Sequence, residues 1–145
     1  MTRESSAPLC VSRAVLEQIG EHCIARYRAQ NGFEEACGLL VGTSANNNIT
    51  EFHAVDNVAA SARIYVMDAK QHMLVERDVE SRGLEVIGVM HSHTHSEAYP
   101  SATDVAQAPD PDWHYMIVTL MNGVPEPRSY RILAGQISEE RIEPA

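Results

Sequence analysis

Two histidines separated by one residue, His91 and His93, have the clearest capacity for chemistry in this sequence. They follow the apolar, β-branched run 85–90, which predicts a β-strand. Because residues i and i+2 of an extended chain point to the same face, both imidazoles can reach one metal ion. Asp104 lies in the first turn of a short helix predicted to begin at Ser101, and that turn can bring its carboxylate back toward the strand end.

Two imidazoles and a carboxylate are a ligand set that suits a catalytic zinc ion. Such a site takes three nitrogen or oxygen ligands from the protein and leaves a fourth position open for water, whose pKa the metal lowers. The sequence therefore predicts one Zn²⁺ per chain, held by His91, His93 and Asp104. A single histidine on a strand is more often a satisfied polar residue, so the prediction rests on the three side chains together.

The spacing of these residues resembles the motif of the JAMM (MPN-plus) family. That motif is H-x-H, seven residues, then S-x-x-D, and its fixed positions are filled here by His91, His93, Ser101 and Asp104. The family also places a glutamate upstream, just before a glycine-containing strand, and Glu35 of the segment EACGLL stands in that context. The motif resemblance runs from this glutamate to the aspartate, and the predicted order of helices and strands is compatible over nearly the whole chain.

The resemblance implies a role for each matching residue. His91, His93 and Asp104 would hold zinc, Glu35 would act as general base and pass the proton to the leaving group, and Ser101 would donate a hydrogen bond to the oxyanion. It also implies an α/β fold, with a single MPN/JAMM domain built as a curved mixed β-sheet flanked by helices, related to the cytidine deaminases. The implied reaction is hydrolysis of an amide or isopeptide bond.

The residues after the second histidine narrow the expected substrate. Most members of the family have proline directly after that histidine, whereas this chain has Thr94, followed by Glu-Ala-Tyr-Pro-Ser at 97–101. This stretch is similar to the small bacterial stand-alone branch, which acts on ubiquitin-like sulfur-carrier proteins ending in Gly-Gly and releases cysteine in cysteine biosynthesis. A chain of 145 residues also leaves no room for the insertions that grip ubiquitin in eukaryotic relatives.

Two other functions are alternatives to this hypothesis. The first is a deconjugase, or a peptidase that trims tails, acting on other ubiquitin-like proteins. The second is a non-catalytic MPN scaffold that only binds partners. Because scaffolds of that kind typically lack the metal ligands and every ligand position is filled here, the sequence favours an enzyme.

Neighbouring residues compete for two of the roles. His95 forms a second H-x-H with His93, but from that register the acid position falls on Ala106, which cannot bind metal. We therefore expect His95 at the edge of the pocket or on the surface. Glu34 and Glu35 are adjacent, and either is compatible with a solvated charge before a strand; the family register favours Glu35.

Other polar residues and the cysteines have less specific interpretations. Ser101 has an alternative interpretation, in which it is only the N-cap of its helix. Asn57 is compatible with binding a substrate backbone or with capping a turn. Cys37 lies inside an apolar strand and is expected in the core rather than as a nucleophile, as are Cys10 and Cys23.

The elements that would position these residues form one domain over 9–145, after a flexible tail at 1–8. Asn31-Gly32 is expected to end the first helix, as Arg82-Gly83 ends the second. Strands are predicted over 9–11, 37–42, 49–58, 85–90, 115–121, 129–133 and 136–142, and helices over 13–29, over 68–81 and from 101.

Composition limits the partners and the compartment. The formal net charge of −9, without a Lys/Arg cluster, argues against a nucleic-acid partner. Three widely spaced cysteines do not make a disulfide framework, and neither a signal peptide nor a membrane-spanning run is recognisable. The sequence therefore predicts a cytoplasmic protein that does not insert in a membrane, and it leaves open whether the chain forms a homo-oligomer.

Overall fold

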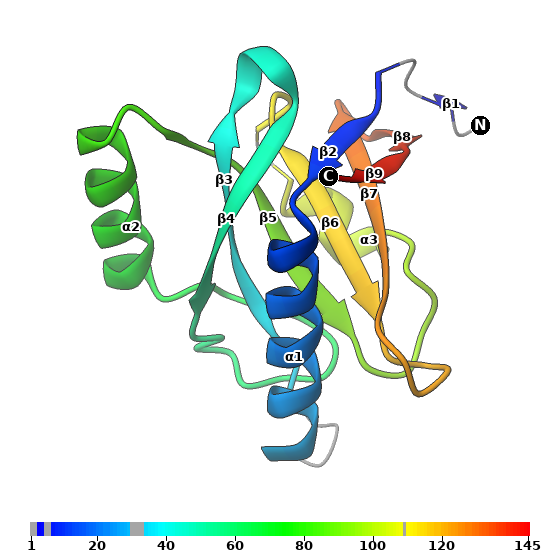
Figure 1. The fold of residues 1–145 in the computed structure, drawn as a ribbon. Coiled ribbons are helices and arrows are strands. Elements are labelled where there is room, and N and C mark those ends of the chain that lie inside the picture. The colour runs from blue at the N-terminus through cyan, green and yellow to red at the C-terminus, as the bar shows by residue number, and fades with distance from the viewer. Residues whose placement is uncertain (1–2, 5–6, 30–33, 109) are drawn as a thin grey trace.

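The computed structural model describes residues 3–4, 7–29, 34–108 and 110–145. These residues form one mixed β-sheet in the order β1-β8-β7-β6-β5-β3-β4-β2-β9, with helices on both of its faces (Figure 1). The strands are β1 (Arg3–Glu4), β2 (Leu9–Val11), β3 (Cys37–Thr43), β4 (Asn48–Val55), β5 (Glu85–His93), β6 (His114–Thr119), β7 (Glu126–Leu133), β8 (Gln136–Glu140) and β9 (Ile142–Pro144). The helices are α1 (Arg13–Ala29), α2 (Ala69–Ser81) and α3 (Ala102–Ala106), with a 3₁₀ turn η1 at Ser44–Asn46.

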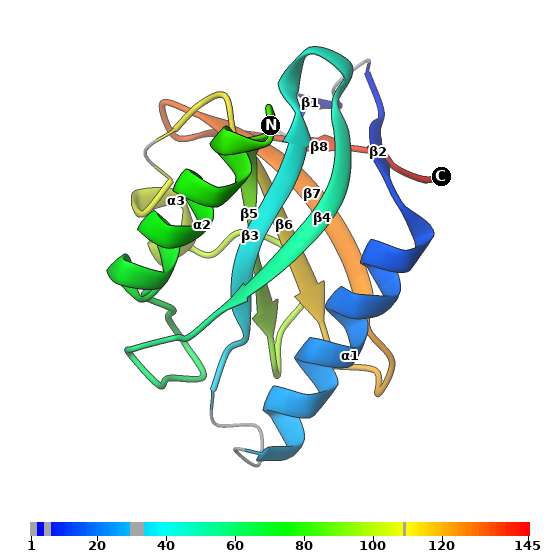
Figure 2. The same cartoon turned by 60° about the vertical axis from the view of Figure 1, so that its left-hand side comes forward.

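Strand β5 lies at the centre of the sheet and organises it. It pairs with β3 in antiparallel and with β6 in parallel orientation, while β3–β4 and β6–β7–β8 are antiparallel neighbours. Helix α1 covers one face, and α2 and α3 lie on the other (Figure 2). Buried side chains of β5 and β6 alternate between these faces: Met90 and Met116 pack in the core beneath α1, whereas Val89 and Tyr115 pack beside α3.

Helix α1 has the bounds that its four-residue apolar period predicts. Val15, Ile19 and Cys23 are all buried against the sheet, as expected for one face of an amphipathic helix. Cys10 is only half-buried, so the expected core position is met by Cys23 but not fully by Cys10. The predicted stop signal at Asn31-Gly32 lies outside the described residues.

The predicted strand over 136–142 is wrong, because this segment contributes to two strands on opposite sides of the sheet: β8, next to the edge strand β1, and β9, at the other edge. β8 ends at Glu140 beside β7, and β9 begins at Ile142 beside β2. Only Arg141 joins them, and its carbonyl accepts a hydrogen bond from Leu9 N at 2.8 Å. The sheet therefore curls until its two edges meet, which a hydrophobic period cannot reveal.

The N-terminal segment bears on the predicted flexible tail, and the helices bear on the predicted absence of a membrane span. Arg3–Glu4, within the predicted flexible tail over 1–8, forms the short strand β1 parallel to β8, while residues 1–2 and 5–6 are outside the described part. The domain boundary at residue 9 stays a prediction. No helix among the described residues combines the length and the apolar composition needed to cross a membrane.

Candidate metal centre

Strand β5 presents His91 and His93 on one face of the sheet at its C-terminal end. A register shift against β3 near Ile87 resets the alternation of side chains, so that positions 89, 91 and 93 share the face that carries α3. Gly88 permits the close approach of β6 at this point, because a Cβ there would collide with the carbonyl oxygen of His114. The strand extends through both histidines, three residues beyond the predicted run, and this extension fixes their backbone.

The three predicted ligands converge. The Nε2 atoms of His91 and His93 are 3.2 Å apart, and Asp104 Oδ2 lies 3.2 Å from the first and 3.0 Å from the second. All three side chains are buried. Because zinc bonds of 2.0–2.1 Å in a tetrahedron place neighbouring ligands about 3.3 Å apart, these donors are spaced as three corners of such a site. The residues present therefore fit the metal by both chemistry and geometry.

The start of α3 holds the carboxylate of Asp104 in place. Ser101 Oγ accepts a hydrogen bond from Asp104 N at 3.0 Å, and Asp104 Oδ2 accepts one from Ser101 N at 2.8 Å, which completes a capping box. Burial opposes ionisation of Asp104, but the hydrogen bonds from His91 and His93 hold the pKa of its carboxyl well below the usual range. The aspartate is thus charged and ready to bind a cation.

The capping role of Ser101 leaves its hydroxyl proton free for a second role. A serine hydroxyl offers one donor and two acceptor positions, and the cap uses only an acceptor. Ser101 is also exposed beside the ligands. Capping and donation to a substrate oxygen are therefore compatible, although the sequence presented them as competing interpretations.

Two further contacts orient the histidine rings. His93 Nδ1 donates to the carbonyl oxygen of Glu97 at 2.7 Å, so the neutral ring that binds a metal ion has its Nε2 lone pair directed at the centre; in the metal-free chain the pKa of His93 is raised and Nε2 bonds Asp104 Oδ2 instead. The ring of Tyr65 stacks on His91 with centroids 4.4 Å apart and an interplanar angle of 21°. Burial lowers the pKa of His91, which favours the neutral, ligating form.

Tyr65 could not be predicted from the sequence as part of the site, because it lies between β4 and α2, where no periodicity or motif marks it.

Glu35 lies beside this cluster, two residues before β3 begins at Cys37. Its side chain is 2% exposed, and among the described residues Oε1 has no hydrogen-bond partner. Burial raises the pKa of its carboxyl to about 8; the charge of His93 lowers this pKa and that of Asp104 raises it, both by less than burial does. A carboxyl group that titrates near neutral pH, with an unoccupied oxygen, is suited to accept and return a proton.

The backbone around Glu35 is held from both sides. Its amide donates to Ser61 O at 2.7 Å, its carbonyl accepts from Asn57 Nδ2 at 3.0 Å, and the next amide, of Ala36, donates to Ser92 Oγ at 2.8 Å. Asn57 also bonds backbone groups of the segment that follows it, so its amide is fully used within the protein. Of the two interpretations of Asn57, the structure supports the turn-capping one.

The competing residues are occupied elsewhere. Glu34 forms an ion pair with Arg26 at 2.7 Å, while His95 is exposed with its ring edge-on to Tyr27, as expected for a surface position. Cys37 is buried in β3 against Val55 O, and burial raises the pKa of its thiol to about 12, which confirms a core position rather than a nucleophile.

Comparison with known proteins identifies the family of this chain. The family model for prokaryotic homologues of the JAB domain matches residues 14–133, which include every residue of the site. The chain belongs to this JAB family. The JAMM resemblance inferred from the motif is thereby confirmed, as is the fold class of a single JAB/MPN domain with a curved mixed sheet.

Three known proteins similar to this JAB domain illustrate the match. The CysO-cysteine peptidase of Mycobacterium tuberculosis is 36% identical over 110 residues, covering 75% of each chain. The desampylase of Haloferax volcanii is 39% identical over 84 residues, covering 57% of this chain and 60% of its own. The solution structure of protein DSY2949 from Desulfitobacterium hafniense superimposes with a TM-score of 0.81 at 27% identity, covering 94% and 92% of the two chains. The chain is a hydrolase of the JAB type.

Proposed function

We propose that this JAB domain is a zinc-dependent peptidase that cleaves the amide bond after the C-terminal Gly-Gly of a ubiquitin-like sulfur-carrier protein and releases cysteine. The observation that carries the proposal is the convergence of His91, His93 and Asp104 beside the buried carboxyl of Glu35. The identity to a CysO-cysteine peptidase over three quarters of both chains supports the choice of substrate.

The chain's own residues divide the work of hydrolysis. When bound by the three ligands, Zn²⁺ would polarise the scissile carbonyl and make water more acidic. Glu35 takes a proton from the attacking water as the C–O bond forms. As the C–N bond breaks, Glu35 returns that proton to the leaving nitrogen, so the ionised carboxylate that began the cycle is restored. Ser101 donates its hydroxyl proton to the carbonyl oxygen as negative charge develops on it.

The raised pKa of Glu35 suits this cycle. A carboxyl with an ordinary pKa would hold the proton too weakly to deliver it to an amine, and burial raises the pKa of Glu35 from that ordinary value, to about 8 in the metal-free chain. The same burial excludes bulk water from the proton being transferred. The substrate is expected to enter as an extended tail, since glycine residues alone have no side chains to clash near the buried ligands.

The test is hydrolysis of a purified carrier–cysteine conjugate by zinc-loaded protein, followed by mass spectrometry of the product. Loss of one cysteine residue from the carrier is the expected result, and an unchanged conjugate would contradict the substrate. Glu35→Gln should bind one zinc per chain and lack activity. Glu34→Gln is the matched control, because it removes an adjacent carboxylate that is paired with Arg26, and it should remain active.

A second candidate function is removal of a ubiquitin-like protein from lysine side chains of other proteins. The identity to a desampylase, over 57% of this chain, favours testing it. Carrier linked through its C-terminus to a lysine-containing peptide serves as the competing substrate. Faster cleavage of this isopeptide than of the cysteine conjugate would assign the chain to deconjugation.

A further inference from the structure

The loop between the second histidine and α3 has an unusual hydrogen-bond pattern. Three consecutive backbone carbonyls, of Ser96, Glu97 and Ala98, each accept a hydrogen bond from a side chain. Thr119 Oγ1 donates to the first at 2.5 Å, His93 Nδ1 to the second at 2.7 Å, and Tyr130 OH to the third at 2.5 Å. The two outer carbonyls are thus attached to the sheet, and the middle one is attached to a predicted zinc ligand.

We propose that Thr119 and Tyr130 are positioning residues, which fix the carbonyl of Glu97 and thereby hold His93 with its Nδ1 proton in place and its Nε2 lone pair toward the metal. This inference rests on the proposed function, because it takes His93 to be a zinc ligand. Neither residue touches the centre itself. Both act through the backbone of the 96–98 loop.

The two outer donors are well placed to hold this loop. Thr119 is at the end of β6, in register with His93 on β5, and Tyr130 is on β7; both are buried. Burial raises the pKa of the Tyr130 hydroxyl to about 12, so it remains a donor at physiological pH. Ala98 packs on the ring of Tyr130 in a small buried cluster, and Tyr99 meets that ring edge-on at 5.5 Å.

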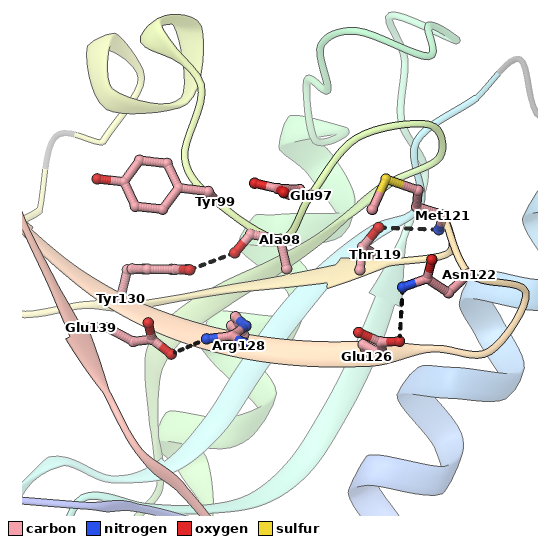
Figure 3. A pocket seen from close by; sticks show the side chains of 10 residues that line it. All are labelled: Glu97, Ala98, Tyr99, Thr119, Met121, Asn122, Glu126, Arg128, Tyr130 and Glu139. Carbon is pink, nitrogen blue, oxygen red and sulfur yellow. Dashed lines mark hydrogen bonds and ion pairs between the residues drawn. The ribbon is translucent and has the colours of Figure 1, made fainter.

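The loop needs these hydrogen bonds because a cavity lies beside it. Ala98, Thr119 and Tyr130 all line this cavity, which has a volume of about 330 Å³ (Figure 3). Figure 3 shows Tyr130 reaching across to the carbonyl of Ala98, with Thr119 below the loop and bonded to Met121 N. Glu97 lines the cavity as well, so its loop is held by directional hydrogen bonds: its own carbonyl accepts from His93 Nδ1 and from Tyr99 N at 2.8 Å, and the carbonyls on either side accept from Thr119 and Tyr130.

The expected consequence is on metal affinity. The hydrogen-bond partner of a ligating histidine fixes its tautomer and ring orientation, and its loss typically lowers metal affinity 10–100-fold. Tyr130→Phe keeps the ring and its packing and removes only the hydroxyl. Because Tyr130 holds the neighbouring carbonyl and not the partner of His93 itself, this variant should weaken zinc binding measurably, by up to about tenfold.

The experiment is competition for zinc between the 145-residue chain and a chromophoric chelator at neutral pH. Wild type is compared with Tyr130→Phe, Thr119→Val and the double variant. Tyr115→Phe is the matched control, because the Tyr115 hydroxyl donates to a backbone carbonyl too, that of Asp110 at 2.7 Å, outside the 96–98 loop. Thermal unfolding of each metal-free variant measures the loss of stability separately.

The inference predicts weaker zinc binding in Tyr130→Phe than in Tyr115→Phe and a further loss of zinc affinity in the double variant. The metal-free Tyr130→Phe should unfold at a temperature no lower than that of Tyr115→Phe, because the Tyr115 hydroxyl also accepts from Asp110 N and so makes one hydrogen bond more. Equal zinc affinity in wild type and Tyr130→Phe would overturn this inference alone and leave the zinc site intact. Absence of zinc binding by wild type would overturn the proposed function and, with it, this inference. If Thr119→Val does not fold, the comparison of zinc affinity between Tyr130→Phe and Tyr115→Phe still tests the inference.

Discussion

Substitution of Glu35 by glutamine should stabilise the metal-free protein increasingly as the pH rises. The carboxyl is almost fully buried, and burial raises its pKa from 4.5 to about 8. Between these two values the folded chain keeps the proton and the unfolded chain releases it. The folded state therefore binds more protons in this window, and its stability falls as the pH increases from about 4.5 to about 8.

The magnitude follows from the two pKa values. Each pH unit well inside the window lowers the free energy of unfolding by about 1.4 kcal/mol, so wild type should lose about 2.5 kcal/mol from this group between pH 5 and pH 7. Glutamine has nearly the same shape and does not titrate. The difference in unfolding free energy, Glu35→Gln minus wild type, should therefore rise by about 2.5 kcal/mol over the same two pH units.

The assay is urea unfolding of both proteins at pH 5, 6 and 7 in the presence of a chelator, followed by circular dichroism. Other titrating groups contribute to both proteins and largely cancel in the difference. Glu34→Gln serves as the control for removal of one negative charge from this segment, since Glu34 is paired with Arg26 rather than isolated. A difference for Glu35→Gln that stays constant from pH 5 to pH 7 would refute the assignment of a raised pKa to this carboxyl.

Three other substitutions test the surroundings of the centre. Ser101→Ala should reduce kcat by about 10²-fold through the lost oxyanion donor and the unfolding free energy by about 1 kcal/mol through the lost cap; unchanged kcat would leave Ser101 a cap only. Asn57→Asp replaces two buried amide donors by an acceptor that faces the Glu35 and Ile64 carbonyls, and should lower the unfolding free energy by about 1–3 kcal/mol in urea titrations; no loss would contradict the contacts seen here. Tyr65→Phe keeps the ring on His91 and should retain zinc affinity in chelator competition, whereas Tyr65→Ala should lower it; equal affinities would show that the stacking has no effect on the metal.

Prediction from sequence succeeded where the signal is local. α1 has the predicted bounds because its apolar residues recur at helical spacing, and Ser101 begins α3 because its hydroxyl and the Asp104 carboxylate satisfy backbone amides a turn apart. Prediction failed at the C-terminus, where Gln136–Glu140 and Ile142–Pro144 separate at Arg141. Periodicity shows that a segment is extended, but it does not show which edge of a sheet the segment joins.

The types and spacing of His91, His93 and Asp104 can be read from the sequence, because alternation along an extended strand places both histidines on one face and the first turn of a helix presents the aspartate. Their convergence also needs the loop between them, which Thr119 and Tyr130 attach to the sheet. The tertiary structure alone decides the proton chemistry around them. Glu35 reaches the centre because β3 pairs with β5, and the adjacent Ala36 amide bonds Ser92, 56 residues away. The same long-range packing buries the Glu35 carboxyl and raises its pKa. Desolvation depends on what surrounds a group, and those surroundings come from segments that the sequence keeps far apart.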